Sequence, residues 1–401
     1  MKNKKSIFML IALVAGLVTA CSGQSAPAAP AAPAAPAAPA APAATVASDA
    51  AAASNAASGS NTQVDKSKLA KQLNLYTWDG YFDQSVLDDF KKEFDVSVKA
   101  ETYDANETMY NKFKAGGNPG YDLIVPSDYM VERMAREGML EKIDFNNVSN
   151  NKLIDPGHTK LYFDPTGEYA IAHNWGTTGI AYDSAKVKGD IKTWKDVFEP
   201  ADTLKGKIGM LDDPREPIAA ALRYLGFNGS TTNLDELAKA KALLLQQKGK
   251  VASYKTSSDY KKDLVAGDVD VAMMYSNDAI LASKDKPSIK YVIPEGKTTI
   301  WQDNICIPKG GKSKYTAEVF INYMLRPDVA AKNANALGLS TSNLGVMQQG
   351  LVDKALLDNK NLYPDDMAGK VKNGTLEWLL RFSDDKITSA YDKVYNEILA
   401  K

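Results

Sequence analysis

The sequence predicts an α/β fold in two lobes, each built on a mainly parallel sheet with helices on both faces. Short apolar runs alternate with amphipathic helical stripes from about residue 68 to the C-terminus, and this is the pattern of strand–helix–strand units. The alternation forms two successive series with no long polar linker between them. The chain has 401 residues, which is enough for about two domains.

The first series begins shortly after residue 68. Val86, Leu87 and Phe90 recur at helical spacing and predict one amphipathic helix. Runs rich in β-branched and aromatic residues on either side favour strands. Strands and helices are expected in alternation over residues 74–78, 84–94, 96–103, 106–116, 121–127 and 129–139.

The second series occupies the middle of the chain and has the same character. A single long helix is expected after it, over residues 316–335. Strands are expected at 207–211, 269–276 and 288–294, and helices at 216–227, 233–247 and 277–284, while the apolar stretch 299–308 leads into the long helix.

The N-terminus predicts export. Three lysines precede an apolar run too short to span a bilayer comfortably, so residues 1–20 are interpreted as a signal peptide. The end of this segment resembles the lipobox of bacterial lipoproteins, which implies cleavage before Cys21 and lipidation of its thiol. Ordinary cleavage near Ala20 is the alternative. Residues 21–67 are rich in Ala and Pro, which prevents a stable helix and predicts an extended tether.

Charge and cysteine content exclude several classes. The net charge is -1 and no basic face is apparent, so neither nucleic acid nor an anionic surface is an expected partner. A lipid on Cys21 would be the membrane contact. No disulfide within the chain can form if Cys21 is lipidated, and Cys306 is expected to be a small buried apolar residue.

Acidic and aromatic side chains gather where the predicted strands end. Ligands of open α/β sheets lie beyond the carboxyl ends of the strands, so these side chains are the candidate site. An acid follows all five of the strands considered, and an aromatic residue accompanies four of them. The residues are Trp78, Asp79 and Tyr81; Ser127, Asp128 and Tyr129; Asp212, Asp213, Arg215 and Glu216; Tyr275, Ser276, Asn277 and Asp278; and Trp301, Gln302, Asp303 and Asn304.

This combination suits a cation with an apolar body. An ammonium group over an aromatic ring gains about 0.5–2 kcal/mol, and a charge-assisted hydrogen bond to a carboxylate adds about 1.5–3 kcal/mol. Each residue alone also has a simpler explanation. An Asp after a strand is often a helix cap or a turn residue, and Asp79 and Asp278 could cap the helices that follow them.

The chain resembles the spermidine/putrescine-binding substrate carriers of bacterial ABC transporters. The resemblance runs from about Leu73 to the C-terminus and includes YTWDGY, TYDANETMYNKFKAG, YDLIVPSDYMVERM, DDPRE, IWQDN and MLRPDVA. It implies a two-lobed fold of the type II periplasmic-binding-protein kind, whose chain crosses twice between lobes that close on the ligand. Lobe one would comprise 68–176 plus 303–347, and lobe two 177–302 plus 348–401.

The resemblance also implies roles for individual residues. Aromatic side chains would form a box around the methylene chain, and acids would hold the amines at its ends. Tyr275 stands where the family usually has Trp, and Leu339 where relatives carry a Tyr over the ligand. The ligand-binding residues implied or indicated are Trp78, Asp79, Tyr81, Ser127, Asp128, Tyr129, Asp213, Glu216, Tyr275, Asp278, Trp301 and Asp303. Spermidine-type and putrescine-type features are mixed, so both ligands stay open.

The sequence leaves three alternative functions. An enzyme is disfavoured because His158 and His173 lie outside the strand-end groups, no GxSxG is present, and GGKS lacks the earlier glycine of a phosphate loop. A binding protein for a sugar, an amino acid or an anion is the second alternative, and the sugar is the nearest of these in side-chain chemistry. A polyamine sensor that signals to a membrane protein is a third.

The sequence thus predicts a lipid-anchored receptor for spermidine or putrescine, in the periplasm or at the cell surface. Its partner would be an ABC permease. We expect a monomer without cofactor, metal or catalytic residues.

Overall fold

The computed structural model describes residues 64–379 and 385–400. The predicted signal peptide, Cys21 and the tether as far as residue 63 lie outside the described residues. In the two described ranges, no helix has the length and apolar character needed to cross a membrane.

The strands of the described chain join into one continuous series of pairs. Their bounds are β1 (Gln72–Trp78), β2 (Ser97–Tyr103), β3 (Leu123–Ile124), β4 (Leu140–Glu141), β5 (Ala170–Asp183), β6 (Ile208–Leu211), β7 (Ser253–Lys255), β8 (Val271–Tyr275), β9 (Ile289–Val292), β10 (Thr298–Pro308) and β11 (Leu376–Trp378). The order is β2-β1-β3-β10-β5-β8-β6-β7, with β11 and β4 beside β10 and β9 beside β5.

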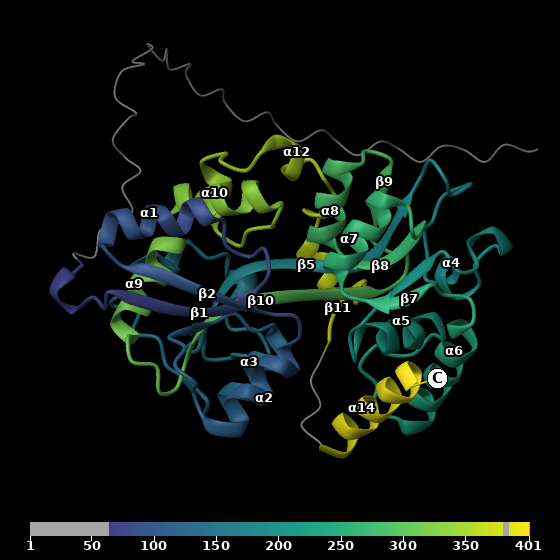
Figure 1. Cartoon of the computed structure of the whole chain (residues 1–401), viewed down its shortest axis with the longest axis horizontal. Coiled ribbons are helices and arrows are strands. Elements are labelled where there is room, and N and C mark those ends of the chain that lie inside the picture. The colour runs from purple at the N-terminus through teal and green to yellow at the C-terminus, as the bar shows by residue number, and fades with distance from the viewer. Residues whose placement is uncertain (1–63, 380–384, 401) are drawn as a thin grey trace, which may run out of the picture. The chain divides into compact units, whose positions relative to one another are not determined.

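The pairing is more mixed than the sequence predicted. Strands β1, β2 and β3 pair in parallel, as do β6, β7 and β8, and β10 with β11. All antiparallel pairs described involve β5 or β10. These two long strands run side by side through the middle of the fold (Figure 1). Parallel pairing therefore occurs within each lobe, and antiparallel pairing occurs along the strands that cross between the lobes.

Helices cover both faces of the sheets. Their bounds are α1 (Gln84–Phe94), α2 (Asn106–Gly116), α3 (Asp128–Arg136), α4 (Lys195–Phe198), α5 (Glu216–Tyr224), α6 (Leu234–Lys248), α7 (Ser257–Ala266), α8 (Ser276–Asp285), α9 (Lys314–Met324), α10 (Pro327–Leu337), α11 (Leu344–Gln348), α12 (Lys354–Leu357), α13 (Met367–Lys372) and α14 (Asp385–Ala400), with short 3₁₀ turns at Lys66–Lys68, Ser149–Leu153, Pro156–His158 and Asp202–Leu204. In Figure 1, α1 and α10 lie above β1 and β2, and α2 and α3 lie below them.

Separate apolar cores define two lobes. The core of lobe one contains Phe90 of α1, Leu123 of β3 and Phe320 of α9, and a second cluster packs under α2 and α3. The core of lobe two contains Leu244 of α6 and Met273 of β8. Because β5 and β10 each contribute residues on both sides, they are the connections between the lobes. The predicted two-lobed α/β fold with two crossings is confirmed.

Two element predictions were wrong. The expected single helix over 316–335 is two helices, because Pro327 cannot continue the hydrogen-bond ladder of α9 and instead starts α10. The expected end of a strand at Trp301 is also wrong, since β10 continues to Pro308. Strand β5 was not foreseen.

The polar stretch of β5 explains why it was missed. A Cβ at Gly176 would lie 2.4 Å from the Trp301 ring, and one at Gly179 would lie 2.4 Å from the Val292 carbonyl oxygen. These glycines are therefore required by close packing. In the sequence alone, these glycines favour a turn and not a strand.

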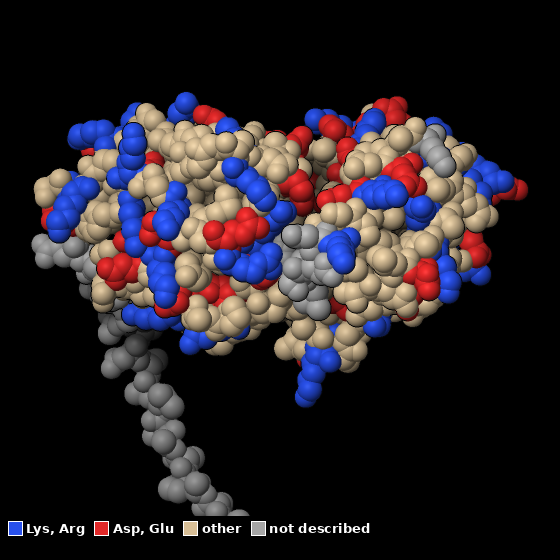
Figure 2. Space-filling view, turned by 90° about the horizontal axis from the view of Figure 1, so that it is seen from below, with Lys and Arg blue, Asp and Glu red and all other residues tan. Residues whose placement is uncertain are grey.

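The lower face of the protein carries interspersed charges. Figure 2 shows Lys and Arg side chains mixed with Asp and Glu over this face. Most of the ion pairs involve exposed groups, such as Lys71 with Asp95, and such pairs contribute little to stability.

Candidate functional site

A cavity of about 520 Å³ lies between the lobes, and all twelve predicted binding residues line it. We call it the acidic cavity. Its size falls within the range of small-molecule sites. The sequence prediction that these side chains come together is thus met, whereas their contact with a ligand stays a prediction. From lobe one come Trp78, Asp79, Tyr81, Ser127, Asp128 and Tyr129; from lobe two come Asp213, Glu216, Tyr275 and Asp278; and from β10 come Trp301 and Asp303.

Asp303 is the most strongly positioned acid. The Tyr81 hydroxyl donates to its Oδ2 and the Ser127 hydroxyl donates to its Oδ1, both at 2.5 Å. The side chain lies in the middle of β10 and only 3% of the residue is exposed. Burial raises the pKa of Asp303 to about 6, although the two hydroxyl donors act to lower it. The carboxyl is thus held in place by neutral donors, and no cation among the described residues pairs with it.

Glu216 is held in the same manner on the other lobe. The Thr178 hydroxyl donates to Oε1 at 2.7 Å and the Thr299 hydroxyl donates to Oε2 at 2.9 Å. Burial, with the charge of Asp213 as the next cause, raises the pKa of Glu216 to about 7. A cation placed nearby would lower this pKa and stabilise the carboxylate.

Asp213 is both a turn residue and a candidate binding residue. Its Oδ1 accepts the backbone N–H groups of Arg215 and Glu216 at 2.7 and 2.9 Å, which closes a turn directly before α5. Its Oδ2 accepts the Tyr275 hydroxyl at 3.3 Å. The carboxyl nevertheless lines the acidic cavity.

Asp128 is buried like Asp303 and Glu216, but its two carboxyl oxygens are not both held by donors. Its Oδ1 accepts the Tyr129 N–H at 2.6 Å, and its Oδ2 has no hydrogen-bond partner among the described residues. Burial raises the pKa of Asp128 to about 8. At neutral pH the group is therefore mainly a neutral acid, which can donate a hydrogen bond.

Asp79 and Asp278 face each other from the two lobes. The charge of Asp79 is one of the causes that raise the pKa of Asp278, after burial, which is the largest. Neither caps a helix as the simpler explanation expected. Asp83 caps α1, and Asp278 lies within the first turn of α8, which begins at Ser276.

Aromatic rings form the remaining walls. The Trp78 indole N–H donates to the Val125 carbonyl at 2.9 Å, which fixes the ring at the end of β1. On the other side, Tyr275 and Trp301 pack edge to face with ring centres 5.7 Å apart. Their faces supply the electron-rich surfaces that attract ammonium groups.

Sequence reasoning left out two acids that line the acidic cavity, and a third, Glu107, that contacts the lining residue Tyr129 without lining the cavity itself. Asp104 follows β2, so the same strand-end rule would have found it. Asp212 was noted after β6 but not chosen. Glu107 of α2 accepts the Tyr129 hydroxyl at 3.1 Å, and burial raises its pKa. No sequence signal marks Glu107, because it depends on how α2 packs on α3.

The charge balance of the acidic cavity defines its chemistry. Among the residues that the structure describes, eight carboxyl groups and one basic residue, Arg215, line it. Uncompensated buried carboxylates are costly, and an entering cation removes that cost. Within the described ranges, no cluster of three or more acidic, His or Cys side chains could hold a metal ion.

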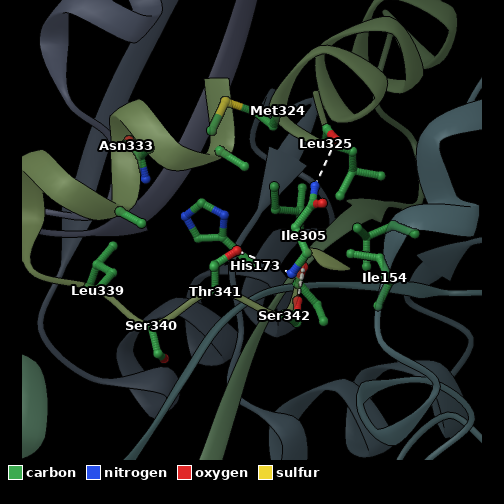
Figure 3. Close-up of a pocket in the computed structure, with 15 residues that line it drawn as sticks. Ile154, His173, Ile305, Met324, Leu325, Asn333, Leu339, Ser340, Thr341 and Ser342 are labelled. Carbon is green, nitrogen blue, oxygen red and sulfur yellow. Dashed lines mark hydrogen bonds between the residues drawn. The ribbon is translucent and has the colours of Figure 1, made fainter. Parts of the chain in front are cut away.

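A second, much smaller cavity lies beside the crossing strands. We call it the small cavity; its volume is about 20 Å³. Figure 3 shows His173 among Asn333, Leu339 and Thr341, with Met324 and Ile305 on the apolar side. His173 and Asn333 both hydrogen-bond to the Tyr81 carbonyl, at 3.2 and 3.0 Å. Leu339 lines this cavity and does not line the acidic one.

Three comparisons place the chain among known proteins. Residues 85–362 match the model of the bacterial extracellular solute-binding proteins. The spermidine/putrescine-binding periplasmic protein of Escherichia coli K12 is 34% identical over 329 residues, 82% of this chain and 91% of that protein. The alignments cover nearly the whole of the folded part.

Two solved structures agree with this relationship. The PotD substrate-binding protein of a spermidine/putrescine ABC transporter from Streptococcus pneumoniae superposes with a TM-score of 0.70 at 29% identity, over 82% of this chain and 98% of that one. The TpPotD lipoprotein of Treponema pallidum gives 0.69 at 28% identity, over 82% and 100%. The chain belongs to the bacterial extracellular solute-binding protein family.

Proposed function

We propose that this protein captures a linear polyamine, spermidine or putrescine, between its two lobes and delivers it to an ABC permease. The observation that carries the proposal is the described lining of the acidic cavity, in which eight carboxyl groups accompany aromatic walls and a single basic residue. Ammonium groups pair with carboxylates, and methylene groups pack on the rings. A sugar would leave most of these charges unpaired. The names of the relatives point to the same ligands.

The ligand contacts follow from the geometry. Asp303, held by Tyr81 and Ser127, would accept one ammonium group, and Glu216 would accept another. Trp78, Tyr275 and Trp301 would enclose the carbon chain. No bond is made or broken in this process, and we propose no catalytic residue and no cofactor.

Closure of the lobes would carry the mechanism. We propose the boundaries 68–176 plus 303–347 for lobe one and 177–302 plus 348–401 for lobe two. The separate cores support this division, because Phe90 and Phe320 lie in one and Leu244 and Met273 in the other. The closed surface would then be recognised by the permease, or by a membrane sensor in the alternative role.

We further propose that the protein is held at a membrane by lipid on Cys21, outside the cytoplasm. A lipoprotein among the structural relatives supports this. Mass spectrometry of the N-terminal peptide tests it, since lipid is expected on Cys21 and its absence would contradict the anchor.

Calorimetric titration of the purified full chain tests the ligand. Putrescine and spermidine are the candidates, with arginine and a sugar as controls. At least one polyamine should bind with a micromolar or lower Kd, which corresponds to about 8 kcal/mol or more. No heat and no thermal stabilisation with either polyamine would refute the proposed function.

A further inference from the structure

Arg215 stands out because, among the described residues, it is the basic residue that lines the acidic cavity. It precedes α5 in lobe two, whereas its guanidinium lies over an aromatic ring of lobe one. The guanidinium carbon lies 4.8 Å from the centre of the Tyr129 ring, which is within the range of a cation–π contact. The side chain therefore spans the opening between the lobes.

The partner of Arg215 is itself firmly held in lobe one. The Tyr129 hydroxyl accepts the Asn106 amide at 3.1 Å and donates to Glu107 at 3.1 Å. The positive charge of Arg215 also lowers the pKa of Glu107, against the larger effect of burial. One guanidinium thus interacts with a ring and a buried carboxyl of the opposite lobe. We call Arg215, Tyr129 and Glu107 the interlobe bridge.

A second pair of residues across the cavity repels instead of attracting. Asp79 of lobe one and Asp278 of lobe two are both acids, and they repel each other across the opening. An ammonium group of the ligand, placed between the two acids, would attract both of them. The interlobe bridge, in contrast, forms without any ligand. Among the groups that line the acidic cavity, Arg215 therefore supplies attraction between the lobes without ligand.

We propose that Arg215 is a positioning residue that stabilises the closed arrangement of the lobes before and after the ligand enters. This inference rests on the proposed function. The interlobe bridge acts on closure of the lobes and not on one particular amine. Its loss should therefore weaken the binding of every polyamine by the same factor. A guanidinium that merely competed with the ligand for carboxylates would have the opposite effect, because its removal would tighten binding.

The test compares four forms of the full chain: wild type, Arg215→Gln, Arg215→Lys and the control Arg326→Gln. Arg326 also lies over a tyrosine, with its guanidinium carbon 5.2 Å from the Tyr323 ring centre, and it pairs with Glu93 and Asp328. These contacts are internal to lobe one and outside the acidic cavity. The control therefore removes one charge and one cation–π contact without touching the interlobe bridge.

The measurements are the Kd values for putrescine and spermidine and the radius of gyration by small-angle X-ray scattering, each with and without ligand. In Arg215→Gln, both Kd values should rise by the same factor, about 3- to 30-fold, and the ligand-free radius should increase. Arg215→Lys should restore part of both effects and also serves if the Gln variant does not fold. Arg326→Gln should match wild type.

A double-mutant cycle with Tyr129→Leu sharpens the test, because the two changes should be less than additive if they break one contact. Tighter binding, unchanged binding or a changed putrescine-to-spermidine ratio in Arg215→Gln would each overturn the inference. Failure of the wild-type protein to bind either polyamine would instead refute the proposed function, so the two failures are distinguishable.

Discussion

The acidic cavity and the small cavity lie on either side of Tyr81 and have opposite character. The Tyr81 side chain donates to Asp303 in the acidic cavity, and the Tyr81 carbonyl accepts hydrogen bonds from His173 and Asn333 at the small cavity. Eight carboxyl groups line the first, and none lines the second among the residues described. The small cavity has room for about one water molecule.

This difference indicates what each space contributes. Groups in the small cavity are neutral and bonded to one another, as in any well-packed interior. Burial lowers the pKa of His173 to about 4, so that it too is neutral. The acidic cavity holds acids at a cost in folding free energy, because burial opposes their ionisation. Such a cost is typical of a binding site and not of a structural core.

The largest expected effect concerns stability and belongs to the small cavity. Leu339→Ala removes a side chain that is 2% exposed, and the free energy of unfolding should fall by about 2–5 kcal/mol. Chemical denaturation measures this change. Polyamine affinity should hardly alter. A loss of affinity as large as that in Asp303→Asn would contradict the separation of the two cavities.

Asp303→Asn should change the binding of polyamine more than the stability of the fold. It removes the negative charge but keeps the shape, and polyamine affinity should fall about 10- to 100-fold, from the loss of about 1.5–3 kcal/mol. Calorimetry measures the affinity.

Asp122→Asn is the matched control, since Asp122 is also a buried acid of lobe one. It accepts the backbone N–H groups of Asn74 and Ser313 at 2.9 and 3.0 Å, outside the cavity. This variant should lose stability but keep its affinity. Equal affinities for Asp303→Asn and wild type would remove Asp303 from the site.

The smallest effect is the pH dependence of stability without ligand. The pKa values of Asp303, Glu216 and Asp128 are raised to about 6, 7 and 8. The folded protein therefore binds more protons than the unfolded chain, and stability falls as pH rises. The two histidines have the opposite effect on stability, but only as pH falls below about 6.5. Between pH 6.5 and 8 the acids dominate, and about 1–2 kcal/mol should be lost.

Thermal unfolding at pH 6.5 and pH 8 measures this loss. A saturating polyamine should reduce or reverse it, because the cation lowers the pKa of the acids and releases their protons. In Asp128→Asn the decline should be shallower. A Tm that rises from pH 6.5 to 8 without ligand would contradict the assignment of raised pKa values.

The sequence was most informative where local pattern determines structure. Helices α1 and α2 were predicted with the bounds that the structure has, because their apolar stripes are regular. The acids were found because parallel strands end at one edge of a sheet. Trp301 and Asp303 were chosen for a wrong reason, since they lie within β10. Residues two apart on a strand share a face, and both line the cavity.

Other features depend on contacts that a sequence does not display. Strand β5 contains Asn174, Gly176 and two threonines, and its glycines are explained only by the ring of Trp301 and the carbonyl of Val292. The contact between Arg215 and Tyr129 joins residues from different lobes. Spacing along the chain carries no information about such a pair.

The place of β10 has a consequence for how the protein folds. Lobe one begins with β1 to β3, yet its sheet continues into β10, and Ser127 is 176 residues from its partner Asp303. The N-terminal third of the chain thus lacks an inner strand until residues 177–302 of lobe two have been synthesised. Contacts of such long range make folding slow. The unpaired edge left by β3 would meanwhile be open to aggregation, and a partner that shields it would favour productive folding.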